Sequence, residues 1–131
     1  MFGRITLKNT DDINYNVIQL TQELTNRKNI DKFNELEELV KLGKISTKEY
    51  AKRVAQVEVE GQINQIKVAS DIGFRFKGDD AATKSFNKLI DEYSKNNKID
   101  LKKRVKASTA HLKLYENQGK SIRNYFLKYK I

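Results

Sequence analysis

Residues 39–52 read "LVKLGKISTKEYAK", and this stretch decides the fold. Gly43 follows the last apolar residues of a helical pattern, and glycine is the residue that a left-handed helix C-cap prefers. Ser46 and Glu49 have the spacing of a capping box, in which the serine side chain caps the first turn of a new helix. The stretch therefore predicts an αα-hairpin, with one helix ending before Gly43 and a continuous helix over 47–70.

Apolar residues at helical spacing extend this pattern on both sides of the hairpin. Each set recurs every three or four residues, which is the spacing of one buried helix face. Short alternating stretches at 4–8 and 72–78 are typical of strands that could pair. We therefore expect a mainly α fold: a compact bundle of about five helices including the αα-hairpin, with at most a small two-stranded sheet. The apolar residues expected to share helix faces are Ile13, Val17, Leu20 and Leu24, then Phe33, Leu36, Leu39 and Val40, then Ala82, Phe86, Leu89 and Tyr93.

The composition excludes several kinds of site. The chain contains no cysteine and one histidine, His111. A disulfide framework, a thiolate metal site and a site of several histidines are therefore excluded, and we expect no metal or other cofactor. With 131 residues, the chain is long enough for one domain over 1–131 and too short for two comfortable cores. It shows neither a signal-like apolar N-terminus nor a membrane span, so we expect a cytoplasmic protein.

The charge is concentrated at one end of the chain. Residues 1–94 contain fifteen basic and fifteen acidic side chains, whereas residues 95–131 contain eleven basic and two acidic ones. The whole net charge of +9 therefore lies in the last 37 residues. A net-neutral helical body over 1–94 with a basic helical element over 95–131 is the pattern expected of a protein that binds a polyanion.

The basic element has a regular pattern when it is read as one helix from Asp100. Six basic side chains then form a row at i+3 and i+4 spacing, and Glu116 is the only acid in that row. The row would be about 42 Å long, which suits the backbone of a nucleic acid better than a small anion. Gly119 is a candidate break in this helix, because glycine weakens a helix interior. The predicted nucleic-acid-binding residues are Lys102, Lys106, Lys113, Lys120, Arg123 and Lys130.

A metal-dependent nuclease is an alternative if residues 56–70 form a hairpin. Alternation would then place Glu58 and Glu60 on one face, with Gln65 and Lys67 on the second strand. This pattern resembles the acidic strand and the [EQ]-x-K strand of metal-dependent nucleases of the restriction-endonuclease class. The resemblance implies carboxylates that hold Mg²⁺ and a lysine that steadies the attacking water. The capping box favours a helix here, and a helix would separate these groups.

A metal-free ribonuclease is a second enzymatic alternative. His111 lies near Ser108, Thr109, Lys113 and Tyr115 in the sequence, and histidine is the usual general acid or base of such enzymes. Small basic nuclease toxins provide an analogy for this hypothesis, but a fold-level analogy does not identify a site.

Our leading hypothesis is a small basic accessory protein that binds nucleic acid, DNA or RNA, through its C-terminal helix. The absence of proline and the many Lys, Asn and Ile residues are typical of an AT-rich bacterium or of its phages, plasmids and other mobile elements. An interaction module for an acidic protein is a further alternative. Tyr125, Phe126 and Tyr129 suit base stacking, a membrane interface or core packing, and the sequence leaves these three open.

Overall fold

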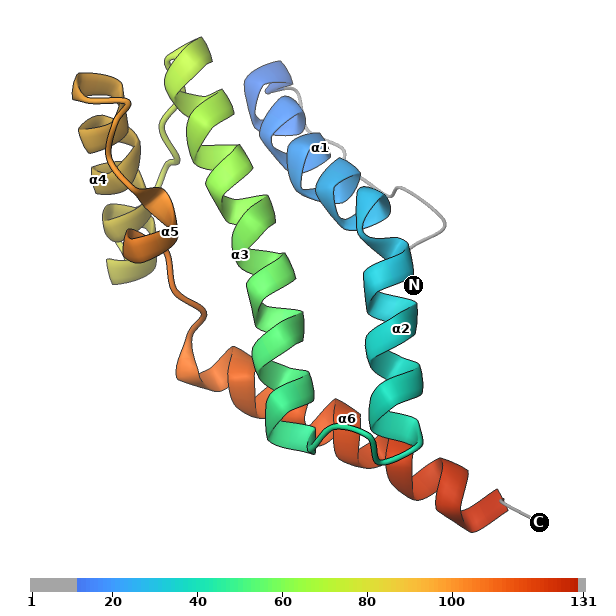
Figure 1. Cartoon of the computed structure of the whole chain (residues 1–131). Coiled ribbons are helices and arrows are strands. Elements are labelled where there is room, and N and C mark those ends of the chain that lie inside the picture. Colours follow the sequence, from blue (N-terminus) through green and yellow to red (C-terminus); the bar gives the residue numbers. More distant parts are fainter. Residues whose placement is uncertain (1–11, 130–131) are drawn as a thin grey trace. The chain divides into compact units, whose positions relative to one another are not determined.

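The computed structural model describes residues 12–129 and contains six α-helices over that range (Figure 1). The predicted mainly α fold is confirmed, and no strand occurs in the range 12–129. The strand expected at 4–8 lies outside the described residues. The helices are α1 (Ile13–Lys28), α2 (Ile30–Lys41), α3 (Thr47–Ile72), α4 (Ala81–Lys95), α5 (Leu101–Arg104) and α6 (Thr109–Tyr129).

Contacts group the chain into two compact units. Among the described residues, the first unit contains 12–27 and Glu60–Lys106, and the second contains Lys28–Val59 and 107–129. The long helix α3 contributes its first half to the second unit and its second half to the first. The organisation inferred from charge, one domain with a neutral body and a basic element, stays a prediction.

The hairpin turn between α2 and α3 forms as the sequence predicts. Gly43 has a φ of +70°, in the left-handed region that glycine adopts most easily. The Gly43 amide donates to the Val40 carbonyl at 3.1 Å, and the Lys44 amide donates to the Leu39 carbonyl at 2.9 Å. These are the two bonds of a Schellman motif, so the ending of α2 is fully capped.

The start of α3 is fixed by Ser46. The Ser46 hydroxyl accepts a hydrogen bond from the Glu49 amide at 3.0 Å, as an N-cap does. The Glu49 carboxylate accepts from Arg53 Nε at 2.9 Å, so this side chain pairs along the helix rather than back to the cap. The predicted continuous helix over 47–70 is confirmed, and α3 runs on to Ile72.

In the first unit, α1 buries a different face from the one that its apolar residues predict. Ile18 and Thr25 are buried, whereas Ile13, Val17 and Leu24 are exposed. Polar bonds from α3 fix this rotation of α1. Gln65 of α3 donates to the Ile18 carbonyl, and Asn64 donates to the Thr25 hydroxyl, each at 3.0 Å. The expected inward face of α1 was therefore wrong.

The strand expected at 72–78 is also wrong, although the chain after Gly73 is not helical. The Asn87 side chain of α4 satisfies the backbone of Phe76: the Phe76 amide donates to Asn87 Oδ1 and Asn87 Nδ2 donates to the Phe76 carbonyl, each at 2.9 Å. The ring of Phe76 meets those of Phe74 and Phe86 edge-to-face, with centroids 4.9 and 5.2 Å apart. Side-chain bonds and ring packing therefore replace a sheet partner. Asp80 caps α4, and Ile90 is its buried residue, whereas Ala82 is exposed.

In the second unit, α6 packs against α2 and crosses the hairpin end (Figure 1). Gly119 of α6 is buried, and a Cβ atom at this position would stand 2.8 Å from Cδ1 of Tyr50 on α3. The glycine therefore permits close approach of α6 to the Tyr50 ring. A Cβ atom at Gly43 would overlap the Arg123 guanidinium, so α6 also reaches the turn itself. Gly119 does not interrupt the helix, which runs from Thr109 to Tyr129.

The C-terminal region is not one helix from Asp100, and this prediction was wrong. α5 ends at Arg104, and Val105 has an extended backbone with ψ of 120° and a buried side chain. The Ser108 hydroxyl then accepts from the His111 amide at 3.1 Å and caps the start of α6. Serine prefers a cap to a helix interior, so the break falls at 105–108 and divides the expected helix into α5 and α6.

Candidate nucleic-acid interface

A shallow hollow of about 650 Å³ lies in the second unit, between the start of α3 and α6. Four lysines line it, two from each helix, and all four are exposed. The rest of the lining is small or polar apart from one leucine. The residues around this basic hollow are Lys48, Ala51, Lys52, Thr109, Leu112, Lys113, Glu116, Asn117 and Lys120.

Local helix geometry places each pair of lysines at the hollow. Lys48 and Lys52 are four residues apart in the first turns of α3, so they share one face. Lys113 and Lys120 are seven residues apart on α6, which is two turns of helix and again one face. The contact between Gly119 and the Tyr50 ring holds α6 against α3, which brings the two pairs around one space.

The hollow keeps a positive balance although it contains one acid. Lys120 Nζ lies 3.4 Å from Glu116 Oε1, an i,i+4 pair. The other nearby acid at the start of α3, Glu49, pairs with Arg53. Four lysines against Glu116 leave a net charge of +3 around the hollow. Exposed ammonium groups on flexible stems are suited to the phosphates of a chain, because they act as point charges without fixed geometry.

The predicted basic row is only partly brought together. Lys113, Lys120 and Arg123 lie on α6, where Arg123 is half-buried. Lys102 lies in α5 and Lys106 lies in the extended segment after it, both in the first unit. Lys130 lies outside the described residues. The 42 Å continuous row was therefore wrong, and the part on α6 spans about 15 Å from Lys113 to Arg123.

The basic hollow also contains two residues that the sequence reasoning missed. Lys48 and Lys52 belong to the first helical turns after the Ser46 cap, in the part of the chain that is neutral overall. Their i,i+4 spacing was the available signal. A net charge summed over a long segment hides this pair of lysines, because Glu49 and other acids of residues 1–94 cancel their charge in the sum.

The hairpin required by the metal-nuclease alternative does not form. Glu58, Glu60, Gln65 and Lys67 all lie within the continuous helix α3, so alternation does not place them on one face. Gln65 instead donates to the Ile18 carbonyl, and Lys67 is exposed. Within residues 12–129, no three His, Asp or Glu side chains are grouped as metal ligands would be.

His111 lies in the first turn of α6 with an exposed side chain. Its ring stacks on Tyr115, with centroids 6.2 Å apart and planes inclined by 29°. Burial, and then the charge of Glu58, raises the pKa of the Tyr115 hydroxyl above its usual value. The Ser108 hydroxyl is engaged as the cap of α6. Of the residues named with His111, Thr109 and Lys113 line the basic hollow.

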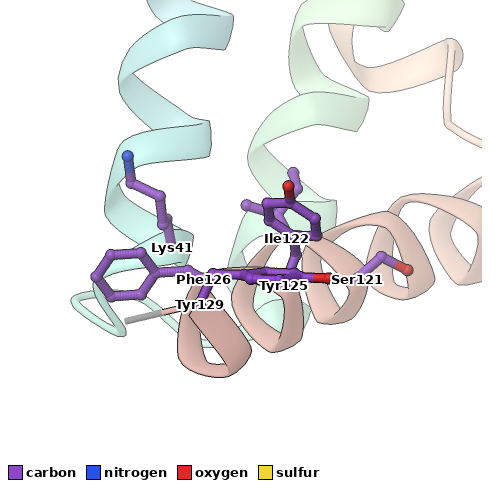
Figure 2. A pocket seen from close by; sticks show the side chains of 6 residues that line it. All are labelled: Lys41, Ser121, Ile122, Tyr125, Phe126 and Tyr129. Carbon is purple, nitrogen blue, oxygen red and sulfur yellow. The ribbon is translucent and has the colours of Figure 1, made fainter. Parts of the chain in front are cut away.

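A second hollow of about 570 Å³ lies between α2 and the last turns of α6 (Figure 2). Three of its six lining residues are aromatic, and Lys41 of α2 is its only charged lining residue within the described part of the chain. The lining residues of this aromatic hollow are Lys41, Ser121, Ile122, Tyr125, Phe126 and Tyr129.

Comparison with models of known protein families, with curated proteins and with solved structures finds no match to this chain. Over residues 12–129, each helix is too short or too polar to cross a lipid bilayer.

Proposed function

We propose that this protein binds nucleic acid through phosphate contacts at the basic hollow. The observation that carries this proposal is the convergence of Lys48 and Lys52 from α3 with Lys113 and Lys120 from α6 around one open hollow. Like charges repel one another, so four lysines gathered around a single acid favour the approach of an anion. Their exposure leaves the ammonium groups available to a partner.

A polyanion with closely spaced charges fits the arrangement better than an isolated anion. Lys113 and Lys120 are about 10.5 Å apart along the axis of α6, and successive phosphates of a stacked strand rise about 3.4 Å each. The lysines of the hollow therefore match several consecutive phosphates. From Asn117 to Tyr129, α6 contains Lys120, Arg123 and Lys128 and no acid, so the positive field continues along the helix.

The test compares two variants that remove equal charge from different places. One variant replaces the four lysines of the basic hollow by glutamine. The matched control replaces four exposed lysines of the first unit by glutamine: Lys84, Lys88, Lys95 and Lys98. Binding of a labelled 20-nucleotide strand and of the corresponding duplex is measured by fluorescence anisotropy at 0.1 M salt.

We expect the hollow variant to lose affinity for the single strand by about 600-fold. Four phosphate contacts on a single strand contribute about 2.8 units to log K between 1 M and 0.1 M salt, because each contact releases bound counterions. The control should lose less than about fivefold. Equal losses in the two variants would indicate diffuse attraction, and tighter binding of poly-glutamate than of either nucleic acid would favour an acidic protein partner. Either result would contradict the proposal.

A further inference from the structure

The aromatic hollow exposes two tyrosine rings that the core does not use. Tyr125 is 69% exposed and Tyr129 is 59% exposed, although both are large side chains near the end of a packed helix. They are four residues apart on α6, so their side chains are neighbours. Their ring centroids lie 4.6 Å apart with planes inclined by 46°. The pair forms an aromatic surface that is open to solvent.

Two lysine ammonium groups lie over aromatic rings at this surface. Lys41 Nζ lies 5.7 Å from the centroid of Phe126, and Lys128 Nζ lies 5.4 Å from the centroid of Tyr129. Lys41 also pairs with Glu38 at 2.6 Å, so its charge is partly balanced. Lys128 is exposed, and no salt bridge within residues 12–129 engages it. The surface thus combines flat rings with positive charge, which is the combination found in grooves that hold single-stranded nucleic acids.

We propose that Tyr125 and Tyr129 form a stacking platform for unpaired bases, so that the protein prefers single-stranded to duplex nucleic acid. This inference rests on the proposed function, because phosphate contacts at the basic hollow deliver the strand to the platform. Bases in a duplex are stacked on one another and do not present their faces, whereas unpaired bases stack on aromatic side chains irrespective of sequence. The phosphate contacts alone give no preference for a single strand, because each contact releases more counterions from a duplex than from a single strand.

The path between the two sites crosses the outward surface of α6. Lys120 and Tyr125 are separated by about 140° around the helix, so the basic hollow and the platform lie on opposite flanks. The exposed side chains between them include the polar Asn117, Ser121 and Asn124 and the apolar Leu114. The axial distance from Lys113 to Tyr125 is about 18 Å, the rise of about five stacked nucleotides. A strand of about ten nucleotides is therefore long enough to reach both sites.

Charge also argues against a second copy of the chain as the occupant. A symmetric dimer joins the same patch of both copies, so Lys128 and its basic neighbours would face themselves. The stretch from Asn117 to Tyr129 contains no acid to balance them. A nucleic acid supplies negative charge and flat apolar faces together, and therefore complements both features of the surface.

The experiment compares three 15-unit ligands: oligo-dT, a strand of abasic sites with the same phosphates, and a duplex. The test variant carries Tyr125→Leu and Tyr129→Leu, which keep apolar bulk but remove the rings. The control variant carries Leu114→Ala and Leu127→Ala, which alter two other exposed apolar residues of α6. Variants with Tyr125→Phe and Tyr129→Phe retain both rings and serve as the rescue.

We expect the wild-type protein to bind oligo-dT at least tenfold more tightly than the abasic strand, and more tightly than the duplex. The tyrosine-to-leucine variant should lose this preference while still binding the abasic strand as the wild-type protein does. The control and the phenylalanine variants should retain it. Circular dichroism checks that each variant is helical.

Equal wild-type affinity for oligo-dT and the abasic strand would overturn the inference and leave the proposed function standing. No binding to any of the three ligands would overturn both. Self-association that is detected by sedimentation and abolished by the tyrosine-to-leucine changes would assign the surface to a second copy, and would also overturn the inference.

Discussion

Replacement of Gly119 by alanine tests the contact that holds α6 against the hairpin. In an isolated helix this change stabilises, because glycine costs about 1 kcal/mol relative to alanine. In this protein the new Cβ atom would lie 2.8 Å from Cδ1 of the Tyr50 ring and 3.4 Å from its Cγ. Real Cβ contacts are not that short, so the ring or α6 must move.

The sign of the net effect depends on the buried ring. Tyr50 is only 4% exposed, so its ring has little room to shift. Forcing extra volume into a packed site costs about 1–3 kcal/mol, which exceeds the gain in helix propensity. We therefore expect Gly119→Ala to lower the free energy of unfolding by about 1 kcal/mol. In a Tyr50→Ala background the obstacle is absent, and the same change should raise it by about 1 kcal/mol.

Urea unfolding followed by circular dichroism measures the stability of the wild-type protein, of the Gly119→Ala and Tyr50→Ala variants, and of the double variant. The large loss expected from Tyr50→Ala itself cancels, because Gly119→Ala is compared within each background. A stabilising effect of Gly119→Ala in both backgrounds would refute the reasoning. It would mean that α6 does not rest on Tyr50, and the basic hollow would then lose its geometric support.

Three further predictions follow from the structure. Ser46→Ala should lower the free energy of unfolding by about 1 kcal/mol in the same urea assay, because α3 loses its N-cap, and an unchanged value would show that the cap is not formed. Burial, and then the charge of Glu37, raises the pKa of the Tyr50 hydroxyl above its ordinary value of 10.0. The free energy of unfolding should therefore fall as pH rises above about 10, because the unfolded state releases this proton first. The Tyr50→Phe variant should lose less stability in this pH range. Parallel pH curves for the wild-type protein and the variant would contradict the burial of the hydroxyl. Incubation with plasmid, single-stranded DNA and total RNA, with and without Mg²⁺, should leave all three intact; Mg²⁺-dependent cleavage lost in Lys67→Ala, or RNA cleavage lost in His111→Ala, would restore an enzymatic alternative.

The hairpin was predictable because its signals are local. The φ of Gly43 and the cap at Ser46 depend on residues within a few positions, and the chain adopts them as the sequence predicts. The break in the C-terminal helix was expected at Gly119 but lies at 105–108, because two local signals compete. Gly119 weakens a helix but permits contact with Tyr50, whereas Ser108 caps a new helix start. Tertiary packing decides between such signals, and it is not visible in spacing.

The site was predictable only in its α6 half. Lys113 and Lys120 follow from the one-sided charge of the C-terminal region. Lys48 and Lys52 join them because α6 crosses the hairpin, which is a contact between segments about sixty residues apart. The inward face of α1 was missed for the same reason, since a side-chain bond from Gln65 to the Ile18 carbonyl overrides apolar spacing.

The most direct test of nucleic-acid binding at the basic hollow is the slope of log K against log salt between 50 and 200 mM. Replacement of Lys48, Lys52, Lys113 and Lys120 by glutamine should make the slope shallower by about 2.8 on a single strand and about 3.6 on a duplex, because four phosphate contacts are lost. The variant with Lys84, Lys88, Lys95 and Lys98 replaced should change the slope by less than about 1, since these lysines belong to the first unit and do not line the basic hollow. Equal changes in the two variants, or a slope near zero for the wild-type protein, would contradict a phosphate-binding surface formed by α3 and α6.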